Sequence, residues 1–163
     1  MNTKRLLLGL VFLLLVGGLG LWLVSQKSPA PVVSGPSLSG SVIATQALQG
    51  KPYLVNFWAT SCVTCVKEMP DLKALQDRFG PQGLRVVAVA MSYDKLAFVE
   101  RFVEERGLPF DVVYDQDGRW AKAFGEVAVT PTTFLVDGQG QLVKRYVGPP
   151  DFEQLGRLIQ KLL

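Results

Sequence analysis

The sequence contains no histidine and only two cysteines in 163 residues. Without histidine, neither a Ser-His-Asp triad nor a Cys-His pair can be assembled, and two cysteines cannot supply the four ligands of a structural zinc site. We therefore expect neither a metal nor a cofactor. Two cysteines are also too few for the disulfide framework of a small secreted scaffold. The chemistry left to this chain is that of the cysteine pair, or none.

An excess of positive charge is also missing from most of the chain. Three of its 17 basic residues, Lys4, Arg5 and Lys27, lie in the first 27 residues, which leaves 14 basic against 14 acidic residues in residues 28–163. Nucleic-acid affinity depends mainly on positive charge facing the phosphates. No nucleic acid is therefore expected as a partner.

The N-terminal part has the opposite character, because residues 6–24 form a run of 19 residues without a charge. As a helix this run is about 28 Å long and can span a bilayer. Lys4 and Arg5 precede it, and the positive-inside bias keeps them in the cytoplasm. A signal peptide cleaved after Ala30 is the alternative, but the run exceeds an ordinary signal-peptide core. We favour a membrane anchor in residues 1–26, with one transmembrane helix.

The rest of the chain divides into a tether and one domain. Residues 27–37 are rich in Ser, Pro and Gly, which indicates a flexible tether. In residues 38–163 apolar runs alternate with helical patterns, which is typical of an α/β sheet. Strands are expected at residues 42–45, 53–59, 84–91, 111–114, 132–136 and 142–147. Helices are expected at residues 62–79, 95–106, 119–124 and from about 152 to the end.

The two cysteines, Cys62 and Cys65, fall where a buried strand ends and a helix begins. The unpaired amides and positive end of the helix stabilise a thiolate at Cys62, while Cys65 lies within disulfide reach on the same face. Because the thiolate is the reacting form, we expect Cys62 to attack and Cys65 to resolve the mixed disulfide. Two inert buried cysteines are the alternative.

Three motifs carry a resemblance to a known family: F-W-A-T-S-C-V-T-C at residues 57–65, K-E-M-P at 67–70 and T-P-T-T-F-L-V-D at 130–137. Together they resemble thioredoxin-fold thiol-disulfide oxidoreductases, more narrowly the membrane-anchored TlpA/ResA type. The resemblance covers about residues 38–163. It implies a thioredoxin-like fold, with a central mixed sheet flanked by helices and an extra helix and strand between Asp94 and Tyr114.

The resemblance also implies how the site is built. It implies a redox-active Cys62–Cys65 disulfide beside a cis Thr130–Pro131 bond, with the Thr130 backbone pairing with an extended substrate segment. Trp58 is the third substrate-binding candidate, although core packing is its more ordinary role.

Two residues depart from the thioredoxin pattern. Asn56 stands where thioredoxin has a buried Asp and cannot accept a proton, so another group must serve Cys65. Glu68, one helical turn beyond Cys65, is the candidate, with a solvated surface carboxylate as the alternative. Ser61 replaces the Trp that precedes the first cysteine in thioredoxin, which changes the partner surface.

The leading functional hypothesis is an extracytoplasmic disulfide reductase that acts on protein disulfides and is restored by a membrane thiol electron donor. The resemblance suggests clients such as the haem-site cysteines of apocytochrome c. It also suggests that this chain is a single-pass protein of the bacterial inner (cytoplasmic) membrane, with its catalytic domain facing the periplasm or cell exterior. A disulfide-forming oxidase is an alternative, because the same two sulfurs can exchange in either direction and the reduction potential decides which. A redox-inert module that binds clients by strand pairing is another.

Overall fold

The computed structural model describes residues 28–163, so the expected transmembrane helix at residues 6–24 lies outside the described residues. No helix within residues 28–163 has the length and apolar character needed to cross a membrane. The strands are β1 (Ser34–Pro36), β2 (Val42–Ala44), β3 (Tyr53–Trp58), β4 (Arg85–Ala90), β5 (Asp111–Tyr114), β6 (Thr132–Val136) and β7 (Leu142–Val147). The helices are α2 (Val63–Phe79), α3 (Leu96–Arg106), α4 (Arg119–Ala123) and α5 (Phe152–Leu162), with short 3-10 turns η1 (Thr45–Leu48) and η2 (Gly80–Gln82).

A mixed sheet of order β5-β4-β3-β6-β7 forms the centre of the domain. Strand β4 is parallel to β3 and to β5, whereas β6 is antiparallel to both β3 and β7. All six residues of the central strand β3 are buried, as expected of an apolar run that is covered on both faces. The thioredoxin-like fold with a mixed sheet is therefore confirmed, and α3 with β5 forms the extra helix and strand.

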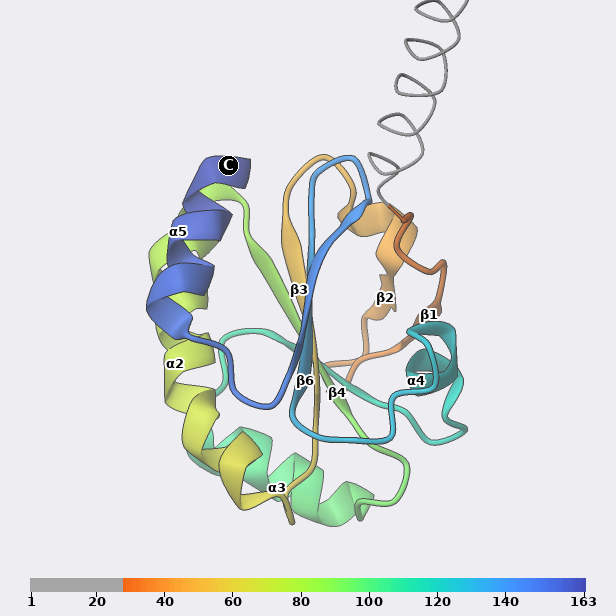
Figure 1. Ribbon diagram of the computed structural model, residues 1–163. Coiled ribbons are helices and arrows are strands. Elements are labelled where there is room, and N and C mark those ends of the chain that lie inside the picture. The colour runs from red at the N-terminus through yellow and green to blue at the C-terminus, as the bar shows by residue number, and fades with distance from the viewer. Residues whose placement is uncertain (1–27) are drawn as a thin grey trace, which may run out of the picture.

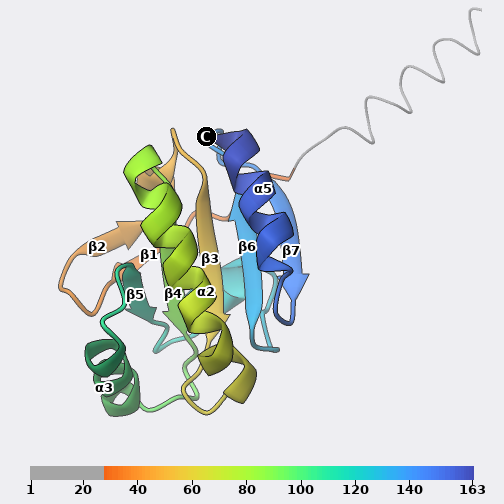
Figure 2. The same cartoon turned by 90° about the vertical axis from the view of Figure 1, so that its left-hand side faces the viewer.

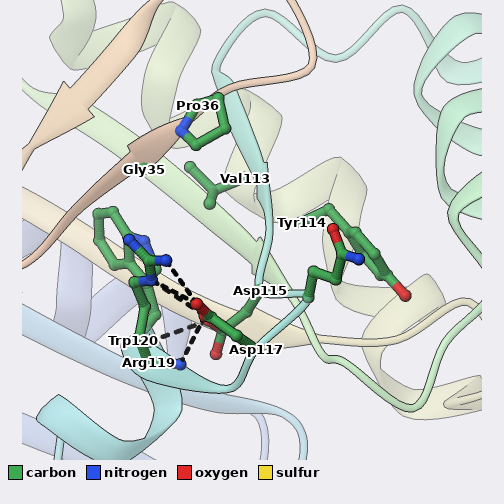
Figure 3. Close-up of a pocket in the computed structure, with 9 residues that line it drawn as sticks. Gly35, Pro36, Val113, Tyr114, Asp115, Asp117, Arg119 and Trp120 are labelled. Atoms are coloured by element: carbon green, nitrogen blue, oxygen red, sulfur yellow. Dashed lines mark hydrogen bonds and ion pairs between the residues drawn. The ribbon is translucent and has the colours of Figure 1, made fainter.

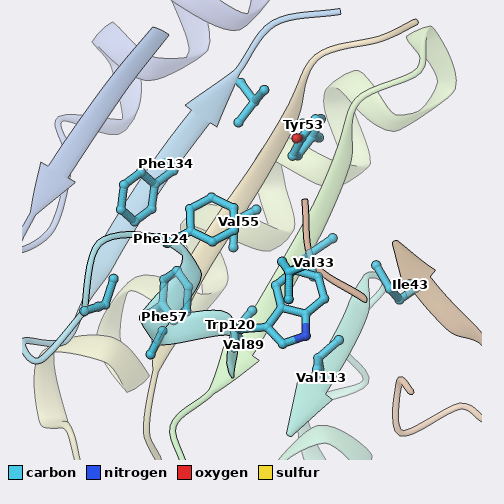
Figure 4. Packing of buried hydrophobic residues seen from close by; sticks show 14 of the residues in the cluster. Val33, Ile43, Tyr53, Val55, Phe57, Val89, Val113, Trp120, Phe124 and Phe134 are labelled. Atoms are coloured by element: carbon cyan, nitrogen blue, oxygen red, sulfur yellow. The ribbon is translucent and has the colours of Figure 1, made fainter. Parts of the chain in front are cut away.

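The two faces of the sheet are covered by different elements (Figures 1 and 2). Helices α2, α3 and α5 pack on one face, and α4 with the β1–β2 pair lies on the other. The α4 side holds a cluster of aromatic rings, in which Phe124 packs at 4.9 Å from Phe134 and at 5.6 Å from Phe57, centroid to centroid (Figure 4). Apolar side chains are thus buried on both faces of the sheet, and this burial holds the helices against it.

Helix α2 follows β3 after a short turn and carries the cysteine pair. Its side chains Met69, Leu72, Leu75 and Phe79 recur at three- and four-residue spacings, and all are buried against the sheet. This is the pattern of an amphipathic helix with one apolar face. The start of α2 is therefore held at the end of the central strand.

Residues 28–37 correct the expectation of a flexible tether. The Leu142 N–H donates to the Ser28 carbonyl at 2.8 Å, the Ala30 N–H donates to Gly140 O at 2.8 Å, and β1 pairs antiparallel with β2. Val33 is buried in the core on the α4 side. Proline has no N–H to donate, so it is tolerated at the edge of a sheet, where the residues between the prolines make the hydrogen bonds. The folded domain therefore begins by Ser28.

The register of the sheet shows that Ser28 and Cys62 lie at opposite ends of it. Val136 pairs with Tyr53 at the start of β3 and with Leu142, the residue bonded to Ser28. Cys62 instead follows the other end of β3. The chain thus enters the described domain at one end of the sheet and carries its reactive pair at the opposite end (Figure 1).

Candidate active site

Cys62 and Cys65 form a disulfide at the start of α2, with their Cα atoms 5.2 Å apart. Cys65 is completely buried, whereas Cys62 is partly exposed. Of the two cysteines, Cys62 is therefore the one open to an external disulfide.

Backbone hydrogen bonds position Cys62 as the N-cap of α2. Its N–H donates to Ala59 O at 3.1 Å, which closes the turn after β3, and its carbonyl accepts from Val66 N at 3.0 Å. The Cys65 N–H points at Cys62 Sγ, 3.2 Å away. A donor aimed at the sulfur and the positive end of the helix both favour negative charge there. The Cys62 sulfur therefore has the surroundings of an attacking thiolate.

The Thr130–Pro131 peptide bond is cis and lies beside the cysteine pair. The Thr130 carbonyl oxygen is 3.7 Å from Cys62 Sγ, although the two residues are 68 positions apart in the chain. The expected cis bond is confirmed. It brings the loop before β6 against the reactive sulfur.

Trp58 does not lie on the substrate surface. Its side chain has no exposed area and packs on Phe102 of α3, with ring centroids 5.1 Å apart. Side chains along a strand alternate between faces, and Trp58 belongs to the face covered by α2 and α3. The expectation that Trp58 binds substrate is wrong for this structure, and core packing is its observed role.

Glu68 is buried, with only 3% of its surface exposed, so it is not a solvated surface carboxylate. The Asn56 side chain on β3 donates from Nδ2 to Glu68 Oε1 at 2.8 Å and to Thr133 Oγ1 at 2.9 Å. Burial raises the pKa of the Glu68 carboxyl to about 7, against the Asn56 hydrogen bond, which lowers it, and with a smaller upward contribution from Asp71. Within residues 28–163, Glu68 Oε2 has no hydrogen-bond partner.

Asp94, which sequence reasoning missed, anchors the turn that precedes Cys62. Its buried carboxylate accepts from the Thr60 N–H and from Thr60 Oγ1, the latter at 2.8 Å, and also from the Lys95 N–H. An Asp in the loop after a buried strand is a turn signal, but nothing in the sequence names its partner. Asp94 joins the loop after β4 to the turn after β3.

A separate cavity of about 460 Å³ lies between β1, the end of β5 and α4 (Figure 3). Its acidic groups are already paired: Asp115 accepts from the Trp120 and Ala121 N–H groups, and Asp117 holds Arg119 Nε at 2.7 Å. Neither cysteine lines this cavity. The redox chemistry is therefore confined to the end of the sheet where Cys62 lies.

A disulfide at the start of a helix, beside a cis-proline loop on a mixed sheet, defines a thioredoxin-like thiol-disulfide oxidoreductase. The Redoxin family matches residues 25–159, and the chain belongs to this family. It is 31% identical to the thiol-disulfide oxidoreductase ResA of Bacillus thuringiensis (strain Al Hakam), over 99% of both chains. It is 36% identical to ResA of Bacillus subtilis (strain 168), over 77% of this chain and 69% of the relative.

The solved structures agree with this assignment. The crystal structure of a thiol:disulfide interchange protein of the thioredoxin family from Chlorobium tepidum matches with a TM-score of 0.77 and 28% identity. The match covers 85% of this chain and 97% of that chain. The chain is therefore an enzyme of the thiol-disulfide oxidoreductase type.

Proposed function

We propose that the protein is a protein-disulfide reductase that works outside the cytoplasm. The observation that carries the proposal is the contrast between a partly exposed Cys62 at the start of α2 and a fully buried Cys65 behind it. The Cys62 thiolate attacks a client disulfide, forms a mixed disulfide and releases one client thiolate. Cys65 then loses its proton and attacks Cys62 Sγ, which closes the Cys62–Cys65 disulfide and releases the second client thiolate. Two electrons pass to the client, and a thiol donor returns the protein to the dithiol.

Glu68 is the proton acceptor for Cys65 in this proposal. A buried thiol ionises poorly without help, and Glu68 lies one helical turn further along α2. Burial raises the pKa of Glu68 to about 7, so its carboxyl titrates near neutral pH and its ionised form can take a proton there. The unpartnered Oε2 atom is available to receive it.

Thr130 and Pro131 bind the client in this proposal. The carbonyl of Thr130 lies within 3.7 Å of the attacking sulfur, so a client segment that pairs with this backbone brings its disulfide to Cys62. The geometry required is that of an extended strand added beside the cis-proline loop.

The uncharged run at residues 6–24 supports anchoring in the bacterial cytoplasmic membrane, with the catalytic domain on the outer side. On that side the dithiol is restored by a membrane thiol electron donor. Extracytoplasmic haem-site cysteines of apocytochrome c are the proposed clients, in keeping with the resemblance to ResA-type proteins.

The reduction potential of the Cys62–Cys65 pair tests the direction of the reaction. Equilibration with defined ratios of reduced and oxidised glutathione should give a potential below about −200 mV, since strong disulfide-forming oxidases lie near −120 mV. A value near that of the oxidases would reverse the assigned direction. A Cys62→Ser strain separates enzyme from binder, because a client-binding module needs no thiolate and would keep its function.

A further inference from the structure

The loop after β4 reaches across the end of β3 to the cis-proline loop. Strand β4 is parallel to β3 and β6 is antiparallel to it, so the residues after β4 and before β6 lie at the same end of the sheet as Cys62. There the Tyr93 hydroxyl lies 3.1 Å from Thr130 Oγ1. The Thr130 carbonyl in turn lies beside Cys62 Sγ. Tyr93 therefore belongs to the immediate surroundings of the reactive sulfur.

Tyr93 is exposed although its loop is fixed. Its side chain keeps 58% of its surface exposed. The residues on both sides are anchored, because the Tyr114 hydroxyl lies 3.3 Å from Ser92 O and 2.9 Å from Asp94 O. The Asp94 carboxylate also holds Thr60 in the turn before Cys62. A ring presented by a fixed loop loses little conformational freedom when a partner packs on it.

Two more apolar side chains are exposed on the segments that carry Cys62 and Thr130. Val63 directly follows Cys62 and is 67% exposed, and Val129 directly precedes Thr130 and is 58% exposed. Three separate segments thus present apolar groups around one reactive sulfur. Exposed apolar groups gathered in this way mark an interaction surface. Oxidised glutathione is a small disulfide rich in carboxylates and has no apolar side chain to lay against them.

We propose that Tyr93 is a specificity-determining residue, whose ring contacts an apolar side chain next to the disulfide-bonded cysteine of an extended polypeptide client. The inference rests on the proposed thiol-disulfide exchange at Cys62. The hydrogen bond to Thr130 shows that the side chain of Tyr93 lies beside the loop that the client pairs with. Clients with apolar residues beside the cysteine are therefore reduced faster than clients with glycine there.

The test compares three disulfides of equal chemistry and different surroundings. The first is a peptide disulfide flanked by leucine and phenylalanine, the second is the same peptide flanked by glycine, and the third is oxidised glutathione. Tyr93→Ala should lower kcat/KM for the apolar peptide about tenfold, the size of effect expected on losing one packed aromatic contact. The change should appear mainly in KM. Tyr93→Phe keeps the ring and should stay within about threefold of the unaltered protein.

Phe98→Ala is the matched control, because Phe98 is an aromatic residue of similar exposure, 54%, on α3. It should leave all three rates unchanged, as should Tyr93→Ala for the glycine-flanked peptide and for glutathione. An equal loss for every disulfide in Tyr93→Ala, or the same loss in Phe98→Ala, would overturn the role of Tyr93. Failure of the unaltered protein to exchange with any of the three would instead refute the proposed function.

Discussion

Asn56 donates a hydrogen bond to Glu68 across the interface between the central strand and the helix that begins after Cys62, at 2.8 Å between Nδ2 and Oε1. Both residues are buried: Asn56 has 0% and Glu68 has 3% of its surface exposed. The pair therefore keeps an ionisable group inside the domain, on the same helix as the resolving cysteine.

Glu68→Gln should slow resolution of the mixed disulfide while leaving the first attack by Cys62 nearly intact. The glutamine keeps the shape and can still accept from Asn56, but it cannot take the proton of Cys65. Loss of general-base help of ordinary size slows a step by roughly 10- to 100-fold. Release of a disulfide-linked peptide, followed by acid quench and gel electrophoresis, measures the step. Asp77→Asn, which alters an exposed carboxylate further along the same helix, is the control. Unchanged release in Glu68→Gln would leave water as the proton acceptor.

Stability should fall as pH rises through the titration of Glu68. The unfolded chain loses this proton near pH 4.5, whereas burial raises the folded-state pKa to about 7, so between these values the folded state binds one more proton. The free energy of unfolding should therefore drop between pH 5 and pH 8, by up to about 3 kcal/mol. Urea unfolding of the oxidised protein and of Glu68→Gln at both pH values measures it. The absence of histidine removes the usual confounding group. Equal pH dependence in the two proteins would contradict the assignment.

Cys62 should be the cysteine that reacts with an alkylating agent after reduction of the disulfide. Cys62 is partly exposed and its sulfur faces the Cys65 N–H, whereas Cys65 is fully buried. Brief labelling at neutral pH followed by mass spectrometry of the peptides should find the label on Cys62, at least about tenfold over Cys65. Preferential labelling of Cys65, or equal labelling of both cysteines, would contradict the assignment of Cys62 as the attacking and Cys65 as the resolving cysteine.

Asp94→Ala should destabilise the domain by about 2 kcal/mol, because it removes the acceptor of the Thr60 and Lys95 donors in a buried position. Asp117→Ala is the matched control, since that exposed carboxylate pairs with Arg119 beside it. An exposed ion pair contributes little, so this variant should lose less than about 1 kcal/mol. Urea unfolding monitored by tryptophan fluorescence compares them, and equal losses would count against the anchoring role of Asp94.

The full-length chain should sediment with the membrane fraction, with its domain open to protease only from the non-cytoplasmic side. The basis is the uncharged run at residues 6–24 behind Lys4 and Arg5. Protease treatment of intact spheroplasts and of lysed cells distinguishes the two sides. Recovery of a soluble chain that begins after Ala30 would replace the anchor with a cleaved signal peptide.

The order of strands and helices could be predicted because buried strands and amphipathic helices have different periods along the chain. The expected strand at residues 53–59 and helix at residues 62–79 correspond to Tyr53–Trp58 and Val63–Phe79. The position of Cys62 and Cys65 at the junction of this strand and helix was enough to indicate a redox site. The packed course of residues 28–37 was missed, because a proline-rich composition does not distinguish a tether from an edge strand.

Contacts between segments far apart in the chain were harder to predict. Alternation along β3 puts Leu54, Asn56 and Trp58 on one face, which could have indicated that Asn56 faces α2 and that Trp58 is buried. No such period applies to Tyr93 or Asp94, which lie in a loop. Their partners depend on how the turns after β3 and β4 meet in space, and local sequence does not encode that meeting.

The entry of the chain at Ser28 has a consequence for encounters between molecules. Central strand β3 has six residues, so about 20 Å of extended backbone separates the level of Ser28 from the turn that holds Cys62. The point of attachment and the sulfur thus occupy opposite poles of the sheet (Figure 1). Neighbouring copies fixed by their N-termini to one surface would all present their sulfurs outward, toward arriving clients, and none toward the surface that holds them.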